Sequence, residues 1–285
     1  MNSLTPEHAR RLALETVRAT GLAVGAARVL HTSNTVIVHV EPADVVARVG
    51  PASPADARRE VAIAHALARA GAPVVAPLPR EEPMVREAEG FTITLWEHRP
   101  GTGEPIGAQQ YAQALHRAHA AMRELDVDVP EASSRVDEAL ALLADPERSP
   151  RLRADDRALL EDTLRELRPL VAEASAPQLL HGEPHPGNLL ATASGAVLLD
   201  FETCCRGPVE FDLAHAPQPV AAFYPGADAE LVGACRRLVL AMVTTWRFDR
   251  EDSYPDGLAA GEAWLAALRA GRDPFRDGPG GVLAP

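Results

Sequence analysis

The sequence HGEPHPGNLL spans residues 181–190 and holds two histidines, two prolines, two glycines, a glutamate and an asparagine. Apolar runs lie on both sides of it, QLL at residues 178–180 and AVLLDF at residues 196–201. A stretch this rich in polar groups and helix breakers, set between two apolar runs, indicates a shaped loop between short strands.

This loop and the run after it carry the side chains that point to a chemistry. Strands flanking such a loop would bring Glu183, Asn188 and Asp200 to one mouth. Amide and carboxylate oxygens are the hard ligands that Mg²⁺ prefers, usually one or two of them together with phosphate oxygens. Asn188 and Asp200 are therefore predicted to bind Mg²⁺. Glu183 is then free to take a proton from an attacking hydroxyl.

Composition excludes several classes of protein. The chain has 285 residues, of which 46% are hydrophobic and 24% charged, and these fractions are typical of a soluble globular protein. No apolar run approaches the ~20 residues of a membrane span, and the N-terminus lacks the apolar core of a secretory signal. We therefore expect a cytoplasmic protein with no membrane partner. The sequence leaves its oligomeric state open.

The net charge of the chain indicates which class of molecule it binds. The net charge is −12, and no Lys/Arg cluster beyond pairs such as Arg58-Arg59 is present. A phosphate backbone requires a basic face, so a nucleic-acid partner is excluded and a cationic small molecule fits better.

The three cysteines raise an alternative function. Cys204 and Cys205 are adjacent and poorly placed to bridge each other, so these two and Cys235 are expected to be reduced and buried. His181-Gly182-Glu183 matches the H-x-E start of a zinc deaminase. That site also needs a P-C-x-x-C pair, which adjacent cysteines do not supply.

The first hundred residues alternate short β-like runs with helices. An amphipathic helix opens the chain, capped by Ser3 or Thr5 and stopped at Gly21. Residues 27–50 predict three antiparallel strands with turns at residues 32–34 and 41–44. A helix starts near Ser53 and closes at Gly71, and residues 91–101 predict a further strand.

Helical patterns dominate the rest of the chain. Residues 108–122 and 154–174 have apolar positions at i, i+3 and i+4, and residues 213–249 continue in this style. A strand-rich part followed by a helix-rich part predicts an α+β chain of two lobes. The predicted boundary places residues 1–97 in the strand-rich lobe and residues 98–285 in the helical lobe.

A family resemblance rests on the segments already quoted. HGEPHPGN followed by LLDFE is similar to the catalytic loop and metal segment of the aminoglycoside phosphotransferase family, relatives of choline kinases with a protein-kinase-like fold. The family pattern is H-G-D-x-H-x-x-N followed by a strand ending in I-D-F/W. RGPVEFDLAH at residues 206–215 resembles the family's G-D-P-x-x-D-L-A segment.

The resemblance implies a role for each matching residue. Glu183 stands where the family has its catalytic aspartate, and Asn188 and Asp200 are the Mg²⁺ ligands. His181, His185 and Asp212 support the loop, and His119 matches a family histidine on the preceding helix. Glu202 either assists the metal, contributes to the acceptor site or caps a turn.

The resemblance is weaker in the first lobe. Ser33 and Asn34 match part of the hairpin that covers the phosphates, although no glycine accompanies them. Arg48 replaces the usual strand lysine and can grip phosphate oxygens through its fork, with Glu60 as its ion-pair partner. The adenine of ATP, or the guanine of GTP, is expected to meet backbone groups of Trp96, Glu97 and His98.

The resemblance implies a kinase that phosphorylates a small-molecule hydroxyl, such as an aminoglycoside or another antibiotic. Because a glutamate carboxylate lies one methylene, about 1.5 Å, further out than that of an aspartate, a degenerate pseudokinase-like nucleotide binder is the alternative. A cationic acceptor would find carboxylates in DREDSYPD at residues 249–256. The candidate acceptor residues there are Glu251, Asp252 and Asp256; a solvated loop is the other interpretation.

Overall fold

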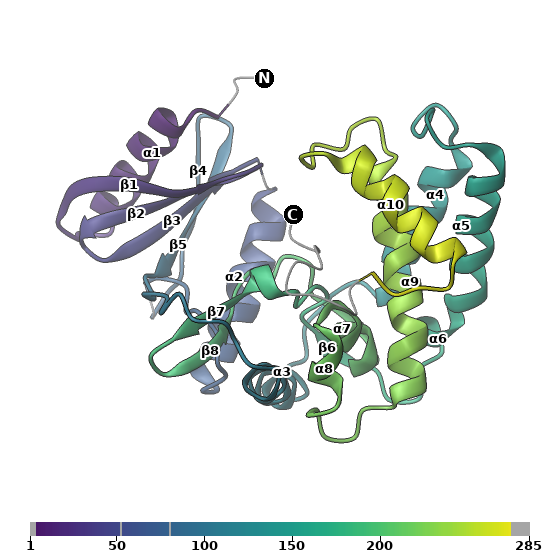
Figure 1. Cartoon of the computed structure of the whole chain (residues 1–285). Coiled ribbons are helices and arrows are strands. Elements are labelled where there is room, and N and C mark those ends of the chain that lie inside the picture. The colour runs from purple at the N-terminus through teal and green to yellow at the C-terminus, as the bar shows by residue number, and fades with distance from the viewer. Residues whose placement is uncertain (1–3, 52, 80, 275–285) are drawn as a thin grey trace. The chain divides into compact units, whose positions relative to one another are not determined.

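The computed structural model describes residues 4–51, 53–79 and 81–274, and its helices and strands form two compact units (Figure 1). The first unit holds the chain up to Pro105 together with Leu190–Glu202, and the second holds Ile106–Leu189 together with the chain from Thr203 onward. The predicted α+β fold class is confirmed. The first unit therefore consists of two separate segments of the chain, because the chain returns to it after the loop at residues 181–188.

Five antiparallel strands form the sheet of the first unit, in the order β1-β2-β3-β5-β4. They are β1 (Val24–Thr32), β2 (Val36–Pro42), β3 (Val45–Gly50), β4 (Val85–Ala88) and β5 (Phe91–Glu97). The three strands expected between residues 27 and 50 and the strand from residue 91 are confirmed. Strand β4 was not predicted, because its four residues VREA have no alternating apolar pattern.

One face of this sheet is buried beneath helix α1 (Pro6–Ala19), which Figure 1 shows lying along the strands. Alternate residues of β2 and β3, such as Val38, Val40 and Ala47, join Leu12 and Val17 of α1 in one apolar core. Since side chains alternate along a strand, the intervening residues of β2 and β3 point to the opposite face of the sheet.

The two predicted helix starts in this unit are confirmed; Ser3, the other residue predicted for the first cap, lies outside the described residues. The Thr5 side chain accepts a hydrogen bond from the His8 N–H at 3.2 Å and caps α1. Ser53 caps α2 (Pro54–Arg69) by accepting from the Asp56 N–H at 3.1 Å. Such caps satisfy backbone donors that have no partner inside the helix.

The segment that returns to the first unit forms the hairpin β7 (Leu189–Thr192) and β8 (Gly195–Leu198). Backbone hydrogen bonds attach it to that unit: the Val75 N–H donates to the Leu198 carbonyl at 3.1 Å, the Leu198 N–H donates to the Pro73 carbonyl at 2.8 Å, and the Thr102 N–H donates to the Ala191 carbonyl at 2.8 Å. The strand before the loop at residues 181–188, β6 (Gln178–Leu180), pairs instead with β9 (Cys205–Gly207).

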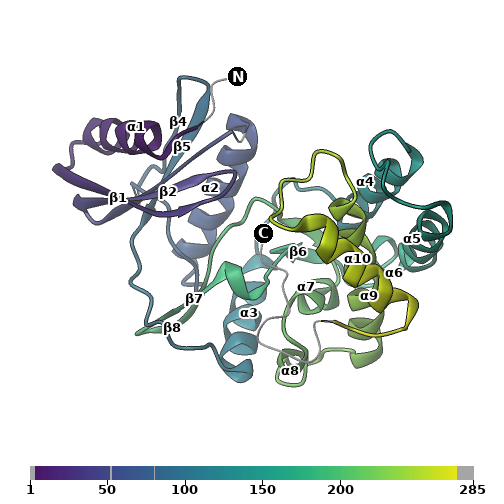
Figure 2. The same cartoon turned by 45° about the horizontal axis from the view of Figure 1, so that its top comes forward.

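Helices build the second unit around α9 (Ala229–Arg247), against which α4, α5, α7 and α10 pack. The bounds are α3 (Ala108–Met122), α4 (Ala132–Ala144), α5 (Ala154–Leu167), α6 (Pro169–Ala172), the 3₁₀ turn η1 (Pro186–Asn188), α7 (Val209–His215), α8 (Gln218–Ala221) and α10 (Gly257–Arg269). Figure 2 shows α10 lying across α9. The α9 residues Leu238, Val239 and Met242 are fully buried in the core.

Two helical predictions need correction. The helix expected over residues 154–174 ends at Leu167, because Pro169 lacks an N–H and begins the separate helix α6. Helix α4 was not predicted. Among the described residues, no helix combines the length and apolar character needed to cross a membrane.

Candidate active site

Asp212 of helix α7 binds the backbone at the start of the loop at residues 181–188. One Asp212 oxygen, Oδ1, accepts from the Gly182 N–H at 2.8 Å, and the other, Oδ2, accepts from the His181 N–H at 2.9 Å. Oδ2 also lies 2.8 Å from Nε2 of His119, whose Nδ1 lies 2.8 Å from the Tyr224 hydroxyl. Asp212 is fully buried, so this carboxylate works as a fixed support for the loop backbone.

Asp212 remains ionised in spite of its burial. Desolvation raises the pKa of a buried carboxyl, but the His119 hydrogen bond, the nearby His181 and the Gly182 N–H outweigh it and hold the Asp212 pKa below its usual range. The support expected for His181 and Asp212 is therefore present in the geometry, and His119 is a buried histidine with both ring nitrogens bonded.

Glycine is required at the second position of the loop. Gly182 has φ +89°, a left-handed conformation that side chains disfavour, and a Cβ there would collide with the carbonyl of Thr203. The Thr203 hydroxyl also donates to the His181 carbonyl at 3.2 Å. The segment after Asp200 therefore packs directly on the start of the loop.

Glu183 is placed between the backbone of its own loop and helix α4. Its carbonyl accepts from the His185 N–H at 2.8 Å and from Nδ2 of Asn188 at 3.0 Å. Its carboxylate oxygen Oε2 lies 3.6 Å from a guanidinium nitrogen of Arg135, and about a quarter (24%) of the side chain is exposed. The carboxylate is thus partly accessible and has one cationic neighbour.

Arg135 is the site residue that the sequence did not reveal. Besides facing Glu183, it donates to the Gly182 carbonyl at 3.2 Å and stacks on the ring of Trp246 at 5.1 Å. Partial burial raises the pKa of Glu183. The charge of Arg135 lowers it, with smaller contributions from His215, His185 and His181, and together these effects outweigh the burial. The pKa of Glu183 is therefore below its usual range. Glu183 is a carboxylate at neutral pH.

The end of the loop presents Asn188 in a defined orientation. His185 begins the 3₁₀ turn by accepting from the Gly187 N–H at 2.9 Å, which makes it a loop brace as expected. Nδ2 of Asn188 donates to the Glu183 carbonyl, and Oδ1 is the acceptor atom of the same amide. An amide oxygen of this kind fits a Mg²⁺ ligand.

In the first unit, Arg48 of β3 gathers three carboxylates. It donates to Glu60 of α2 at 2.9 Å, as the sequence predicted, to Asp200 at 3.1 Å and to Glu202 at 2.5 Å. Burial alone lowers the pKa of the guanidinium, but these three neighbours together raise it, so Arg48 keeps its charge. One positive charge thus faces three acidic groups.

The surplus of negative charge around Arg48 affects the pKa of Glu60. Burial, with smaller contributions from Asp200 and Glu202, raises the pKa of this carboxyl to about 7 against the opposing effect of Arg48. Glu60 also accepts from the backbone N–H of Phe201, which ties the segment after β8 to helix α2. Asp200 has a left-handed φ of 63°, so the chain turns sharply at the predicted metal ligand.

The other residues predicted to bind the nucleotide lie in the turn between β1 and β2 and at the end of β5. Ser33 and Asn34 lie exposed in the turn between β1 and β2, where the Ser33 N–H donates to the Thr35 carbonyl at 2.8 Å. The N–H groups of Glu97 and His98 already donate to the carbonyls of Ala76 and Asp44, at 2.9 and 3.3 Å. A nucleobase here would have to use other groups than these two donors.

Trp96 is a framework residue rather than an exposed contact. Its side chain is 9% exposed, and its indole N–H donates to the Thr94 hydroxyl at 2.8 Å. The neighbouring Glu97 carboxylate accepts from the Ala76 N–H at 3.2 Å and from Arg99 at 2.6 Å.

The acidic stretch at residues 249–256 is partly neutralised by arginines of its own unit. Asp249 pairs with Arg148, and Asp252 lies 3.4 Å from Arg247 with 12% of its side chain exposed. Glu251 and Asp256 remain exposed. Of the carboxylates predicted for acceptor binding, Asp252 has a structural partner in Arg247 and Glu202 has one in Arg48.

The cysteines are reduced and buried, as predicted. Burial raises the pKa of Cys205 and raises that of Cys235 to about 12, so neither is a thiolate at neutral pH. Among the described residues, no cysteine joins a group of side chains able to hold a metal. The zinc-deaminase alternative is therefore unsupported.

With this geometry established, comparison with known proteins identifies the family. A sequence model described as "Phosphotransferase enzyme family" matches residues 27–251, which is most of the chain. The chain belongs to this family. The residues matched run from β1 to the acidic stretch and so include both Arg48 and the loop carrying Glu183.

Solved structures with the same fold include antibiotic and small-molecule kinases. An aminoglycoside 2′-phosphotransferase-IIIa in its GDP complex is 13% identical, with a TM-score of 0.66 and coverage of 91% of this chain and 97% of that one. An amicoumacin kinase in complex with AMP-PNP and Ca²⁺ is 13% identical, with a TM-score of 0.64 and coverage of 96% and 98%. A choline/ethanolamine kinase family protein from Mesorhizobium loti is 16% identical, with a TM-score of 0.66 and coverage of 94% of each chain. No curated protein sequence matches this chain significantly.

Proposed function

We propose that this phosphotransferase uses ATP and Mg²⁺ to phosphorylate a hydroxyl group of a small molecule. The observation that carries the proposal is the Arg48 centre, where one guanidinium faces Glu60, Asp200 and Glu202. A surplus of carboxylates favours a divalent cation, and a guanidinium fork suits phosphate oxygens. A bound nucleoside triphosphate requires both features, carboxylates for its metal ion and a cationic side chain for its phosphate oxygens.

The donor set fits Mg²⁺. Asp200 contributes a carboxylate that is about a third exposed, and Asn188 contributes an amide oxygen oriented by its bond to Glu183. When bound, the metal supplies neutralisation of charge on the β- and γ-phosphates. Arg48, braced by Glu60, is proposed to hold the α- and β-phosphate oxygens.

Glu183 is the proposed base. Its ionised, partly exposed carboxylate can accept the proton of the acceptor hydroxyl while that oxygen attacks the γ-phosphorus and ADP leaves. Arg135 and the loop backbone hold the glutamate in position. The degenerate nucleotide-binding alternative predicts nucleotide binding without turnover.

The proposed acceptor is an aminoglycoside, another antibiotic or a choline-like amine. The net charge of −12 favours a cationic acceptor, and the structural neighbours include kinases named for aminoglycosides, amicoumacin and choline or ethanolamine. A coupled ADP-release screen across these classes, sugars and amino-acid hydroxyls, run with both ATP and GTP, tests this proposal. Turnover with no acceptor class would leave the nucleotide-binding alternative.

Metal binding is tested separately by thermal unfolding. A ligand stabilises the folded state by RT ln(1 + [L]/Kd), so ATP should raise Tm further with Mg²⁺ than with EDTA. Asp200→Ala should abolish the Mg²⁺-dependent part of the shift. Glu87→Ala removes an exposed carboxylate of the same unit and should leave the shift unchanged. An unaltered shift in Asp200→Ala would remove Asp200 from the proposed site.

A further inference from the structure

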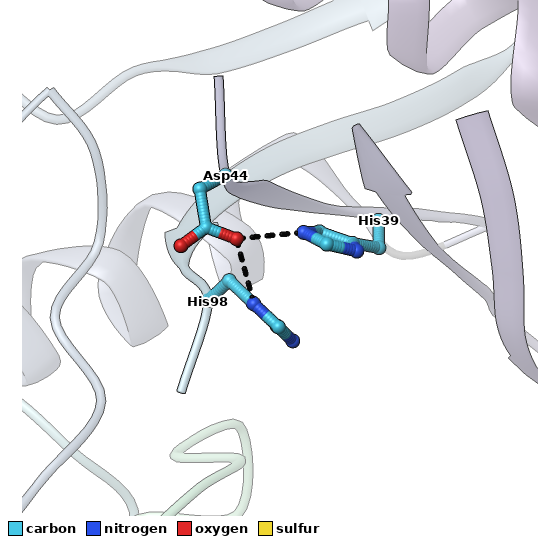
Figure 3. Close-up of side chains that lie close together, drawn as sticks. All are labelled: His39, Asp44 and His98. Carbon is cyan, nitrogen blue, oxygen red and sulfur yellow. Dashed lines mark hydrogen bonds and ion pairs between the residues drawn. The ribbon is translucent and has the colours of Figure 1, made fainter. Parts of the chain in front are cut away.

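Two histidines and an aspartate converge in the first unit, apart from the Arg48 centre (Figure 3). His39 lies on β2, Asp44 precedes β3, and His98 follows β5. The strand order β2-β3-β5 and the register bring them together, since Val45 pairs with both Val40 and Glu97. The His98 N–H completes this junction by donating to the Asp44 carbonyl.

The ligand atoms of the three side chains are close together. Oδ1 of Asp44 lies 2.8 Å from Nε2 of His39 and 2.7 Å from Nδ1 of His98. The two imidazole rings stack at 3.9 Å, and one ligand atom from each of the three residues lies within 4.8 Å of the others. No other group of this kind occurs among the described residues.

We propose that His39, Asp44 and His98 form a binding site for a divalent transition-metal ion. Zn²⁺ is the ion with which the site is tested. Two imidazole nitrogens and one carboxylate oxygen are a borderline donor set, which suits Zn²⁺, Co²⁺ or Ni²⁺ better than Mg²⁺ or Ca²⁺. The site is distinct in chemistry from the oxygen ligands proposed for the nucleotide metal.

The spacing requires only a small adjustment. Zinc bonds of ~2.0–2.1 Å at tetrahedral angles place two ligand atoms about 3.3 Å apart. The two hydrogen bonds must therefore open by about half an ångström as the ion replaces the shared protons. Asp44 can make this movement, because 65% of its side chain is exposed, whereas His39 at 5% and His98 at 20% are held in place.

The protonation state of Asp44 also suits metal binding, because a metal ligand must be in its basic form. Hydrogen bonds from His39 and then His98 lower the pKa of Asp44 below its usual range despite some desolvation, so the group is a carboxylate at neutral pH. Three protein ligands leave further positions for water. The ion would tie the turn before β3 to the end of β5.

The surroundings of His39 limit the affinity of this site for a metal ion. Nδ1 of His39 is buried and has no hydrogen-bond partner in the described part of the chain. Metal-bound histidines usually donate their other N–H to a neighbour, and loss of that partner costs ~10–100-fold in affinity. We therefore expect the ion to bind reversibly and to exchange with chelators.

The test uses the full chain without nucleotide, so that it is independent of the proposed kinase activity. Chelator-treated protein is titrated with Zn²⁺ by calorimetry and with Co²⁺ by visible absorption. We expect one equivalent of Zn²⁺ and a Co²⁺ spectrum of nitrogen and oxygen ligation. His39→Gln and Asp44→Asn should each weaken binding at least ~10-fold, the cost of losing even a supporting group.

Controls separate this site from others. His31→Gln removes an exposed imidazole from neighbouring strand β1, and Asp200→Ala removes a carboxylate of the Arg48 centre; both should retain the full equivalent of Zn²⁺. Circular dichroism confirms that the His39 and Asp44 variants are folded. Absence of Zn²⁺ binding, or binding unchanged in both variants, would overturn the proposal and leave the cluster as a hydrogen-bonded brace.

Discussion

At the scale of single residues, Glu183 stands where the sequence resemblance implies an aspartate, which is one methylene shorter, and the structure gives this glutamate several contacts. Arg135 lies 3.6 Å from its carboxylate, and two hydrogen bonds to its carbonyl fix the backbone on either side of Pro184. The Tyr111 hydroxyl further donates to the Pro184 carbonyl. The longer side chain is thus held at both ends.

The first prediction concerns the length of this side chain. Because Arg135 and the loop are adapted to glutamate, Glu183→Asp should withdraw the carboxylate from the acceptor and lower kcat with nearly unchanged ATP affinity. Glu183→Gln and Glu183→Ala should lose more, about 10²- to 10⁴-fold. Steady-state kinetics with the acceptor from the screen measures this. A gain in activity by Glu183→Asp would contradict the adaptation, and normal turnover by Glu183→Ala would exclude Glu183 as the base.

Arg135 gives a second prediction at this scale. Arg135→Ala removes the cation that lowers the Glu183 pKa, so that pKa should rise. A base must be deprotonated to act, so the acid limb of the kcat profile should move to higher pH. Arg135→Lys keeps the charge and should move it less, while losing the stacking on Trp246. An unshifted acid limb in Arg135→Ala would mean that Arg135 supports the fold alone.

At the scale of elements, helix α7 combines the support of the loop with a pH-sensitive residue. His215 at its end is 3% exposed, and both ring nitrogens lack a hydrogen-bond partner among the described residues. Burial lowers its pKa from 6.5 to about 4, against a smaller opposing effect of Glu183. The folded protein therefore holds this histidine neutral.

This pKa predicts how stability depends on pH. Between about pH 6.5 and pH 4 the unfolded chain binds a proton that the folded protein does not, so stability falls as the pH falls. The full difference corresponds to roughly 3 kcal/mol. Denaturant unfolding of His215→Phe should lack this part of the decline, whereas His31→Gln, at an exposed position, should retain it. Parallel curves for His215→Phe and the unaltered protein would contradict the assignment.

The elements also show what the sequence can and cannot predict. Valine alternation and side-chain caps at Thr5 and Ser53 were sufficient to predict the first strands and helices. Helix α4 begins at Ala132, and its N-cap residue Glu131 makes no side-chain capping hydrogen bond, so the sequence shows no start signal for this helix. Since α4 was not predicted, its Arg135 was not placed beside Glu183 either.

The same limit applies to contacts between distant strands. The Arg48 and Glu60 pair was predictable because a family motif links a strand to the helix after it. The convergence of His39, Asp44 and His98 depends on the register of three strands, which no local pattern in the sequence specifies. Tertiary pairing, rather than propensity, decides such sites.

At the scale of the whole molecule, charge is the property that bears on the acceptor. The net charge of −12 attracts cations over distances comparable to the Debye length, about 8 Å at physiological salt. Within the acidic stretch, Asp249 and Asp252 are paired with arginines, so Glu251 and Asp256 are the exposed carboxylates proposed to bind a cationic acceptor.

The last prediction separates general attraction from local recognition. For a cationic acceptor, kcat/KM should fall as salt rises, whereas a neutral acceptor should show little change, because screening weakens only charge interactions. Neutralising both residues, with Glu251→Gln and Asp256→Asn together, should raise KM for the cationic acceptor by at most about 30-fold, since each exposed charge contributes up to ~1 kcal/mol. ATP binding should be unaffected. Glu173→Gln with Glu166→Gln, which removes two exposed charges from α5 and from the end of α6 in the same unit, is the control. An equal rise in KM in both double variants would show that only the total charge matters, and no rise in either would leave residues 249–256 as a surface loop.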